Sequence, residues 1–144
     1  MRYVRQILNH KGTDVVTISP DQTVFEALEL MAIHNIGAVA VLENSRLVGI
    51  FSEREYARSV ILLGRASKDT PIRDIMISRV LYVTPAHHVN ECMALMTEKR
   101  VRHLPVVDND QLVGLISLGD VVKDIISEQN HMIEDLEAYI SPGR

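Results

Sequence analysis

The chain has 144 residues, of which 47% are hydrophobic and 24% charged, and its formal net charge is −4 at pH 7. This composition is typical of a globular protein, and the negative charge together with 4% aromatic residues disfavours nucleic acid as a partner. The single cysteine, Cys92, excludes an internal disulfide and is typical of a reducing compartment, so we expect a cytoplasmic protein. The longest stretch without Asp, Glu, Lys or Arg covers residues 30–42, and a membrane helix needs about 20 apolar residues. No contact with a membrane is therefore expected.

An internal duplication is the most informative feature of the sequence. Residues 17–58 align with residues 82–123 without a gap, at a constant offset of 65, and share 11 identities over 42 positions. Unrelated chains of average composition would share about two or three. We therefore predict two pseudo-symmetric repeats, at 1–65 and 66–128, with the final helix continuing to about residue 140.

Each copy is predicted to form a β-α-β-β-α unit, so the fold class is α/β (α+β). In the first copy, Thr23 and Glu26 form a capping box that begins a helix, and residues 43–45 form a hairpin turn. The first copy's elements are expected at residues 15–18, 23–35, 38–42, 47–51 and 52–63. Those of the second are expected at 80–83, 88–99, 104–107, 112–116 and from 117 onward. Residues 64–70, small and polar, are the predicted linker.

Two elements of the second copy carry further expectations. Pro105 lacks a backbone donor, so it should lie near the start of its strand or at a sheet edge. The final helix carries an apolar stripe on an otherwise charged surface, and this stripe either folds back on the repeats or packs on a partner chain. Its members are Ile125, Ile126, Met132, Ile133, Leu136 and Ile140.

The corner where the last predicted strand meets the last helix has the chemistry of a nucleotide site. Ser117 opens the helix, whose unpaired amides and partial positive charge favour a phosphate. The carboxylate of Asp120 can accept hydrogen bonds from the two hydroxyls of a ribose. Arg102 and His103, at the start of the preceding strand, can neutralise phosphate charge. The same Ser-x-x-Asp spacing is also a capping box, so a purely structural interpretation stands beside the functional one.

The motifs Gly-Ile-Phe-Ser-Glu-Arg-Glu (49–55), Gly-Leu-Ile-Ser-Leu-Gly-Asp (114–120) and Arg-His-Leu-Pro-Val-Val (102–107) resemble those of the cystathionine-β-synthase (CBS) domain pair. The resemblance covers the chain from about Val4 to Ile126. It implies a free-standing bacterial or archaeal CBS pair, also called a Bateman module, whose two clefts bind AMP, ADP, ATP, NAD(H) or S-adenosylmethionine. It further implies a homodimer that regulates another protein, whose identity the sequence does not give. AMP is the ligand expected first.

Two clefts are expected. The second is built on Ser117 and Asp120, with its base-side wall supplied by the opposite repeat, as the resemblance implies. Its expected residues are Lys11, Gly12, Thr13, Val15, Val101, Arg102, His103, Leu104, Pro105, Ile116, Ser117 and Asp120.

The first cleft departs from the family pattern, because Glu55 stands where aspartate is usual and Gly37-Ala38 replace Arg102-His103. We expect it to bind a mononucleotide more weakly than the Asp120 cleft, or to prefer a different ligand. Its expected residues are Ile36, Gly37, Ala38, Phe51, Ser52, Arg54, Glu55, Arg58, Ser78 and Val80, with Arg65 or Lys68 as further sources of positive charge.

Other functions receive little support from the sequence. It contains no nucleophile elbow, P-loop or Gly-x-Gly-x-x-Gly motif, so neither catalytic residues nor a catalytic cofactor are expected. His87 and His88 are adjacent and are expected to face solvent, without forming a metal site. The basic run 99–103 is interpreted as a solvated face. Two functions remain: a sensor of adenine nucleotide or NAD(H) levels, and a dimerisation scaffold with vestigial clefts.

Overall fold

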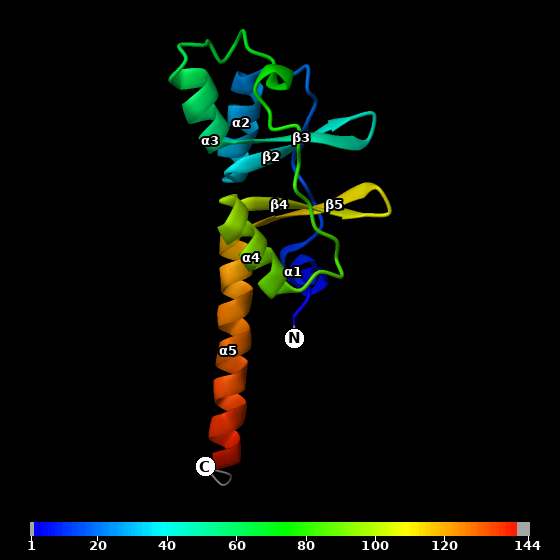
Figure 1. Cartoon of the computed structure of the whole chain (residues 1–144), viewed down its shortest axis with the longest axis vertical. Helices are drawn as coiled ribbons and strands as arrows, with labels where there is room; N and C mark the ends of the chain where they lie inside the picture. The colour runs from blue at the N-terminus through cyan, green and yellow to red at the C-terminus, as the bar shows by residue number, and fades with distance from the viewer. Residues whose placement is uncertain (1, 141–144) are drawn as a thin grey trace.

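The computed structural model describes residues 2–140, in which two small sheets with their helices are stacked along the long axis of the molecule (Figure 1). In the first repeat the strands follow the order β1-β2-β3, with β1 parallel to β2 and β2 antiparallel to β3. The helix after β3 begins as α-helix and continues as π-helix. The elements are β1 (Thr17–Ile18), α2 (Val24–His34), β2 (Ala38–Glu43), β3 (Arg46–Ser52), α3 (Glu53–Glu55) and the π-helix η1 (Tyr56–Ile61).

The second repeat reproduces this plan, which confirms the duplicated fold. Its elements are α4 (Val89–Lys99), β4 (His103–Asp108), β5 (Gln111–Ser117) and α5 (Leu118–Ile140). Both hairpins bend at equivalent places, because the strand register shifts between Val41 and Leu42 in one and between Val106 and Val107 in the other. Helices α2 and α4 end at equivalent left-handed residues, Asn35 and Arg100.

The strand predicted at 80–83 is wrong. Val83 alone pairs with the sheet, as its N–H donates to the carbonyl of Pro105 at 3.0 Å and its own carbonyl accepts from Val107 N–H at 2.8 Å. Leu81 and Tyr82 are exposed, so no packing holds the rest of this run against the sheet. Pro105 is the third residue of β4. Its backbone carbonyl and nitrogen face Val83 and not β5, so the ladder between β4 and β5 loses no donor.

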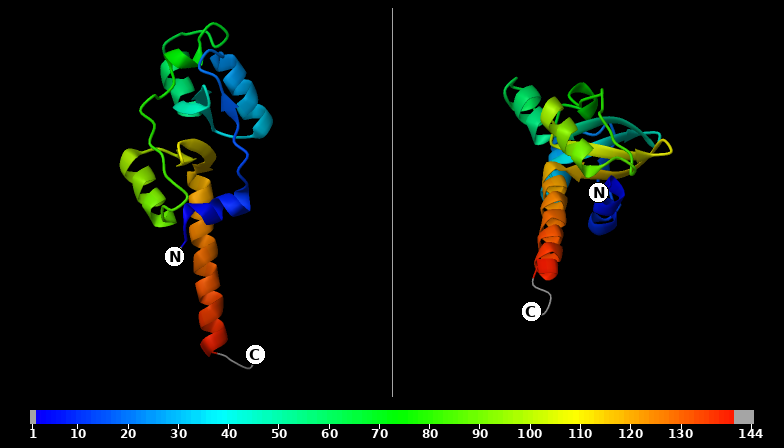
Figure 2. Two further views of the ribbon diagram at one scale, coloured as in Figure 1. Left: turned by 90° about the vertical axis from the view of Figure 1, so that its right-hand side faces the viewer. Right: turned by 60° about the horizontal axis from the view of Figure 1, so that its bottom comes forward.

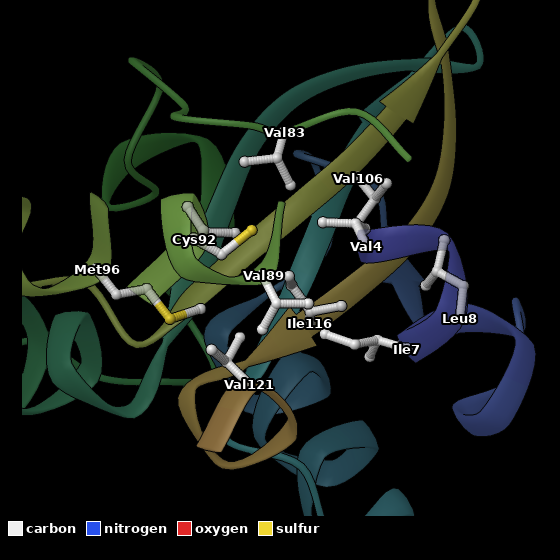
Figure 3. Close-up of a cluster of buried hydrophobic side chains, with 11 residues drawn as sticks. Val4, Ile7, Leu8, Val83, Val89, Cys92, Met96, Val106, Ile116 and Val121 are labelled. Carbon is white, nitrogen blue, oxygen red and sulfur yellow. The ribbon is translucent and has the colours of Figure 1, made fainter. Parts of the chain in front are cut away.

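The segments that lead into the two repeats are exchanged. Helix α1 (Val4–Lys11) packs into the core of the second repeat, where Val4, Ile7 and Leu8 lie on one side of a buried cluster that includes Ile116 (Figure 3). The short 3₁₀ helix η2 (Ile72–Asp74) and the residues after it pack into the core of the first repeat. Each repeat is therefore completed by chain that the sequence duplication assigns to the other.

Two glycines mark the close approaches that this exchange requires. A Cβ atom on Gly114 would lie 2.5 Å from Leu8 Cδ2, and one on Gly49 would lie 2.5 Å from Met76 Sδ. The two glycines are separated by the 65-residue offset, and Leu8 and Met76 occupy matching places in the two leading segments. Only a residue without a side chain lets these segments lie directly on the sheets.

Helix α5 leaves the repeats and extends away from them (Figures 1 and 2). Near its start, Arg2 forms an ion pair with the buried carboxylate of Asp124, at 2.5 Å. Ile125 is half-buried and packs against the core of the second repeat, but from Ile126 onward the apolar side chains of the stripe are uncovered, with Ile126 51%, Leu136 58% and Ile140 75% exposed. Apart from Ile125, the stripe therefore does not fold back on the repeats. No helix within residues 2–140 combines the length and apolarity that crossing a membrane requires.

Candidate functional site

The corner between β3 and α3 places Ser52 and Glu55 together. Glu55 Oε1 accepts hydrogen bonds from Ser52 N–H at 2.9 Å and from Ser52 Oγ at 2.6 Å, and the residue is only 8% exposed. Both bonds end on one carboxylate oxygen, so the capping role leaves acceptor capacity on Oε2. The structural and the functional interpretation of this motif are therefore compatible.

A cavity of about 280 Å³ opens beside this corner, between the two repeats. The first repeat contributes Ile50 and the carboxylates of Glu53 and Glu55 to its lining, and the chain of the second repeat contributes Ile77 and the cationic side chains of Arg100 and Arg102. Small-molecule sites in proteins have volumes of about 300–1,000 Å³ and combine apolar walls with a few polar groups. The cavity is lined by Gly37, Ile50, Ser52, Glu53, Arg54, Glu55, Ile77, Arg100, Val101, Arg102 and His103.

One wall comes from the second repeat's leading segment. Ile77 joins β3 as an isolated bridge, exchanging backbone hydrogen bonds with Ile50 at 2.9 and 3.0 Å. Sequence reasoning expected Ser78 and Val80 at this wall, but Ile77 lines the cavity and neither of those residues does. The sequence predicted the correct segment, since Ile77 directly precedes Ser78. The pairing of Ile77 with β3 shows which residue of that segment faces the cavity.

Two of the arginines that line the cavity join the repeats. Arg54 Nη1 donates to the carbonyl oxygen of Arg100 at 2.7 Å, which ties α3 to the end of α4. Arg102 and His103 were expected at the Asp120 cleft, but they line the Ser52 cavity as well as a groove beside Ser117. A Cβ atom on Gly37 would lie only 3.4 Å from His103 Cε1, so the missing side chain at Gly37 makes room for this imidazole.

His103 is half-buried, and burial lowers its pKa. The positive charges of Lys11 and Arg102 lower it further, while the carboxylate of Asp120 acts in the opposite direction. The imidazole is therefore neutral near pH 7 in the free protein and can take up a proton when an anion arrives.

The Ser117 corner differs from the Ser52 corner. Asp120 Oδ2 accepts from Ser117 N–H at 2.8 Å and from Lys11 Nζ at 2.5 Å, and Lys11 also donates to the carbonyl of Leu115 at 2.7 Å. Burial raises the pKa of Asp120, but the hydrogen bonds from Lys11 and Ser117 outweigh it and hold the pKa below its usual value. The carboxylate that was expected to hold a ribose is thus already an ion-pair partner.

Ser117 and Asp120 also face different hollows. Ser117 lines an open groove of about 550 Å³ together with Arg102 and His103. Asp120 lines a separate hollow of about 410 Å³ between α1 and α5, together with Lys11. The structure therefore does not bring the residues of the expected second cleft to one cavity.

Several expected site residues lie elsewhere. Phe51, Ala38, Leu104, Pro105 and Ile116 are buried in the cores. The expected residues that line none of the cavities named above are Gly12, Thr13, Val15, Ile36, Ala38, Phe51, Arg58, Arg65, Lys68, Ser78, Val80, Leu104, Pro105 and Ile116.

The two adjacent histidines do not face solvent as expected. His87 Nδ1 accepts from Thr84 N–H at 2.9 Å, and the ring of His88 stacks on Tyr3 with ring centroids 4.5 Å apart. Both residues help to place the start of α4 against the segment before α1. Within residues 2–140, no group of three His, Cys, Asp or Glu side chains is arranged to hold a metal ion.

The duplicated β-α-β-β-α fold with a cavity between its repeats defines a CBS domain pair. The sequence profile of the CBS domain matches residues 4–61 and 72–127, so the chain belongs to the CBS domain family. It is 41% identical over 128 residues to the CBS domain-containing protein CBSX3, mitochondrial, of Arabidopsis thaliana, covering 85% of this chain and 62% of that protein. It is 35% identical over 118 residues to the CBS domain-containing protein YhcV of Bacillus subtilis, covering 82% of this chain and 84% of that protein.

A solved structure, that of the CBS domain protein NE2398, supports the same assignment. It is 47% identical, has a TM-score of 0.84, and covers 87% of this chain and 98% of its own. The fold and the family are therefore established together.

Proposed function

We propose that this CBS pair is a regulatory module that binds an adenosine ligand in the cavity at Ser52 and Glu55, and that it is not an enzyme. The observation that supports this is the mixed lining of the cavity. Glu55 provides a carboxylate for ribose hydroxyls, Ile50 and Ile77 provide apolar surface for a base, and Arg54, Arg100 and Arg102 provide positive charge for phosphate. These are the three kinds of group that an adenosine nucleotide needs.

Each contact has a definite physical role. Hydrogen bonds between the Glu55 carboxylate and two ribose hydroxyls are charge-assisted and stabilise binding by about 1.5–3 kcal/mol each. Arg102 and Arg100 can meet a phosphate with paired N–H donors, which lysine cannot do. Because these groups come from both repeats, the ligand bridges them.

The order of the two clefts is the reverse of the one expected from sequence. We place the main site at Glu55, since Asp120 is paired with Lys11 and shares no cavity with Ser117. An adenosine ligand at Asp120 would first have to break that pair.

Regulation follows from the bridging position. A ligand that contacts both repeats favours the arrangement in which its contacts are all made, and it shifts the protein toward that state by its difference in affinity between states. The surface that a regulated partner recognises would then change with ligand concentration. The cytoplasm is the proposed location, in keeping with the single buried cysteine.

Two structures with the same fold hold adenosine compounds. The CBS domain protein PAE2072 of Pyrobaculum aerophilum is complexed with AMP, and the CBS domain pair of MJ0100 is complexed with 5′-methylthioadenosine and S-adenosyl-L-methionine. They are 23% and 22% identical to this chain, so the likeness concerns the fold. They indicate that the fold can accommodate an adenosine group.

We also propose that the chain forms a homodimer in which two α5 helices pair as a parallel coiled coil. The exposed apolar residues of α5 follow the heptad spacing of a coiled-coil seam, with isoleucine at the a positions 126, 133 and 140. The d positions are Val122, Gln129 and Leu136. β-branched residues at a with leucine at d favour two parallel strands. A second copy supplies the matching seam by symmetry.

A ligand panel tests the proposal against the alternative of a scaffold with vestigial clefts. Thermal unfolding of the full chain is measured with AMP, ADP, ATP, NAD, NADH and S-adenosylmethionine. A ligand at a hundredfold excess over its Kd stabilises the folded state by about 2.7 kcal/mol, which shifts the midpoint measurably. A midpoint unchanged by all six compounds would support the scaffold.

A further inference from the structure

A groove adjoins the proposed nucleotide cavity where arginines line both. Its volume is about 580 Å³, and it shares Arg54, Arg100, Val101 and Arg102 with the cavity, so the two are continuous. The groove is lined by Arg54, Arg58, Met96, Thr97, Arg100, Val101, Arg102 and Leu118.

Four of these lining residues are arginines, and none is acidic. Elsewhere, Arg2, Arg65 and Arg73 each form a salt bridge with a carboxylate. Among residues 2–140, none of the four groove arginines forms a salt bridge with a carboxylate, and Arg54 instead donates a hydrogen bond to the backbone carbonyl of Arg100. In a chain whose net charge is −4, this gathering of unpaired guanidinium groups is a local exception to the overall charge.

The bond from Arg54 to the Arg100 carbonyl ties α3 to the end of α4, but the four guanidinium groups also repel one another. Arg54 and Arg58 lie four residues apart, on α3 and η1, and like charges at such a spacing destabilise a helix. The side chains are exposed, so they can move to meet a ligand. An anion in the groove would relieve their mutual repulsion.

The charges along the cavity and groove are also ordered. Glu53 and Glu55 line the cavity but not the groove, whereas Arg58 lines the groove but not the cavity. A ligand with a neutral sugar at one end and several negative charges at the other is therefore oriented by the site. A single phosphate would reach the shared arginines, and only a longer phosphate chain would extend to Arg58.

We infer that the groove holds the phosphates beyond the first, so that the Glu55 site prefers nucleoside di- and triphosphates to monophosphates. This inference rests on the proposed function and adds the charge class of its ligand. Arg58 is the residue that separates the two classes, because it alone of the four arginines lines the groove without lining the cavity.

The test is calorimetric titration of the full chain with AMP, ADP, ATP and inorganic tripolyphosphate at one fixed salt concentration. We expect ATP to bind about tenfold or more tightly than AMP, as extra charge-assisted bonds predict. The substitution Arg58→Gln should weaken ATP binding about tenfold and leave AMP binding unchanged. Arg46→Gln is the matched control, since Arg46 is exposed, forms no salt bridge among residues 2–140 and lies at the far end of β3; it should change neither.

The outcomes separate the two proposals. Equal affinities for AMP and ATP, or an equal loss of both in Arg58→Gln, would overturn the inference while the proposed function stands. Tripolyphosphate binding as tightly as ATP would also overturn it, because the nucleoside would then add nothing. If none of the three nucleotides binds, both proposals fail.

Discussion

Lys11 Nζ lies 2.5 Å from Asp120 Oδ2, and so links the end of α1 to the first turn of α5. The same ammonium group donates to the carbonyl of Leu115 on β5. This contact holds the exchanged helix α1 to the second repeat, and it occupies the carboxylate that the sequence predicted to hold a ribose. One ion pair thus contributes to the fold and distinguishes the environment of Asp120 from that of Glu55.

Replacing Lys11 by methionine should have a small effect on stability and a clear effect on Asp120. The side chains are 40% and 24% exposed, and pairs of this kind stabilise a protein by less than about 1 kcal/mol. Because the bond from Lys11 lowers the pKa of Asp120, the variant should show a higher pKa for that carboxyl, measured by NMR titration. Urea unfolding measures the free energy of unfolding of the variant. A decrease of more than about 2 kcal/mol would be too large for an ion pair as exposed as Lys11–Asp120.

The contact between Gly114 and Leu8 predicts a coupled pair of substitutions. Gly114→Ala places a Cβ atom 2.5 Å from Leu8 Cδ2, and overpacking of this kind destabilises by about 1–3 kcal/mol. Leu8→Ala removes buried methyl groups and destabilises by about 2–5 kcal/mol. In the double variant the clash disappears, so the combined loss should be smaller than the sum of the two.

Gly119→Ala is the control for this pair. Its Cβ would meet nothing closer than Ser117 Oγ at 3.6 Å, and alanine is a better helix former than glycine, so this variant should be slightly more stable. Strictly additive losses for Gly114→Ala and Leu8→Ala, measured by urea unfolding, would show that α1 does not lie on β5 as described.

His103 makes stability depend on pH. Burial, then Lys11 and Arg102, lower its pKa in the folded protein, while the unfolded chain titrates near the ordinary value of 6.5. As pH falls through 6.5, the unfolded state takes up protons before the folded state does, so this contribution is present above that pH and is lost below it. Urea unfolding between pH 7.5 and 5 should show the decline, and His103→Gln should reduce it.

The His103 imidazole is also expected to take up a proton when a nucleotide binds. A phosphate beside His103 favours the charged ring and raises its pKa, so nucleotide affinity should increase as pH falls from 7.5 toward 6. NMR titration of the ring measures both states directly. A His103 pKa at or above 6.5 in the free protein would be inconsistent with the environment described.

Much of the fold could be predicted from the sequence, because the local signals agree with the duplication. The capping residue Thr23 accepts a hydrogen bond from Glu26 N–H at 3.2 Å as the capping box predicts, and the hairpin turns lie at Asn44 and Asn109. The resemblance placed Lys11 at the cleft of the opposite repeat, but the local signals alone do not show that α1 and η2 are exchanged, since this depends on which of two similar cores each apolar segment meets. For the same reason, the sequence assigned Arg102 only to the cleft at Asp120, although in the structure Arg102 also lines the cavity at Glu55.

The α5 seam predicts that one charge abolishes dimerisation. Ile133→Asp places a carboxylate at the centre of the proposed coiled coil, so light scattering should give a monomer mass, whereas Ala138→Asp on the opposite face should leave the dimer intact. Leu136→Cys should form a disulfide between two parallel helices. The native thiol does not interfere, because Cys92 is buried and burial raises its pKa to about 11. A wild-type protein that is monomeric at micromolar concentration would contradict the seam.

Whether an adenosine nucleotide binds between the repeats at Glu55 can be decided by calorimetric titration of two matched variants. Glu55→Gln keeps an oxygen that can accept from Ser52 N–H, so the helix start is preserved while the charge is lost. We predict that it weakens nucleotide binding about tenfold or more, as loss of a bond to a charged group implies. Asp120→Asn should change the affinity by less than about threefold, since Asp120 already serves Lys11. Unchanged binding in Glu55→Gln together with lost binding in Asp120→Asn would place the nucleotide in the other cleft and contradict the account.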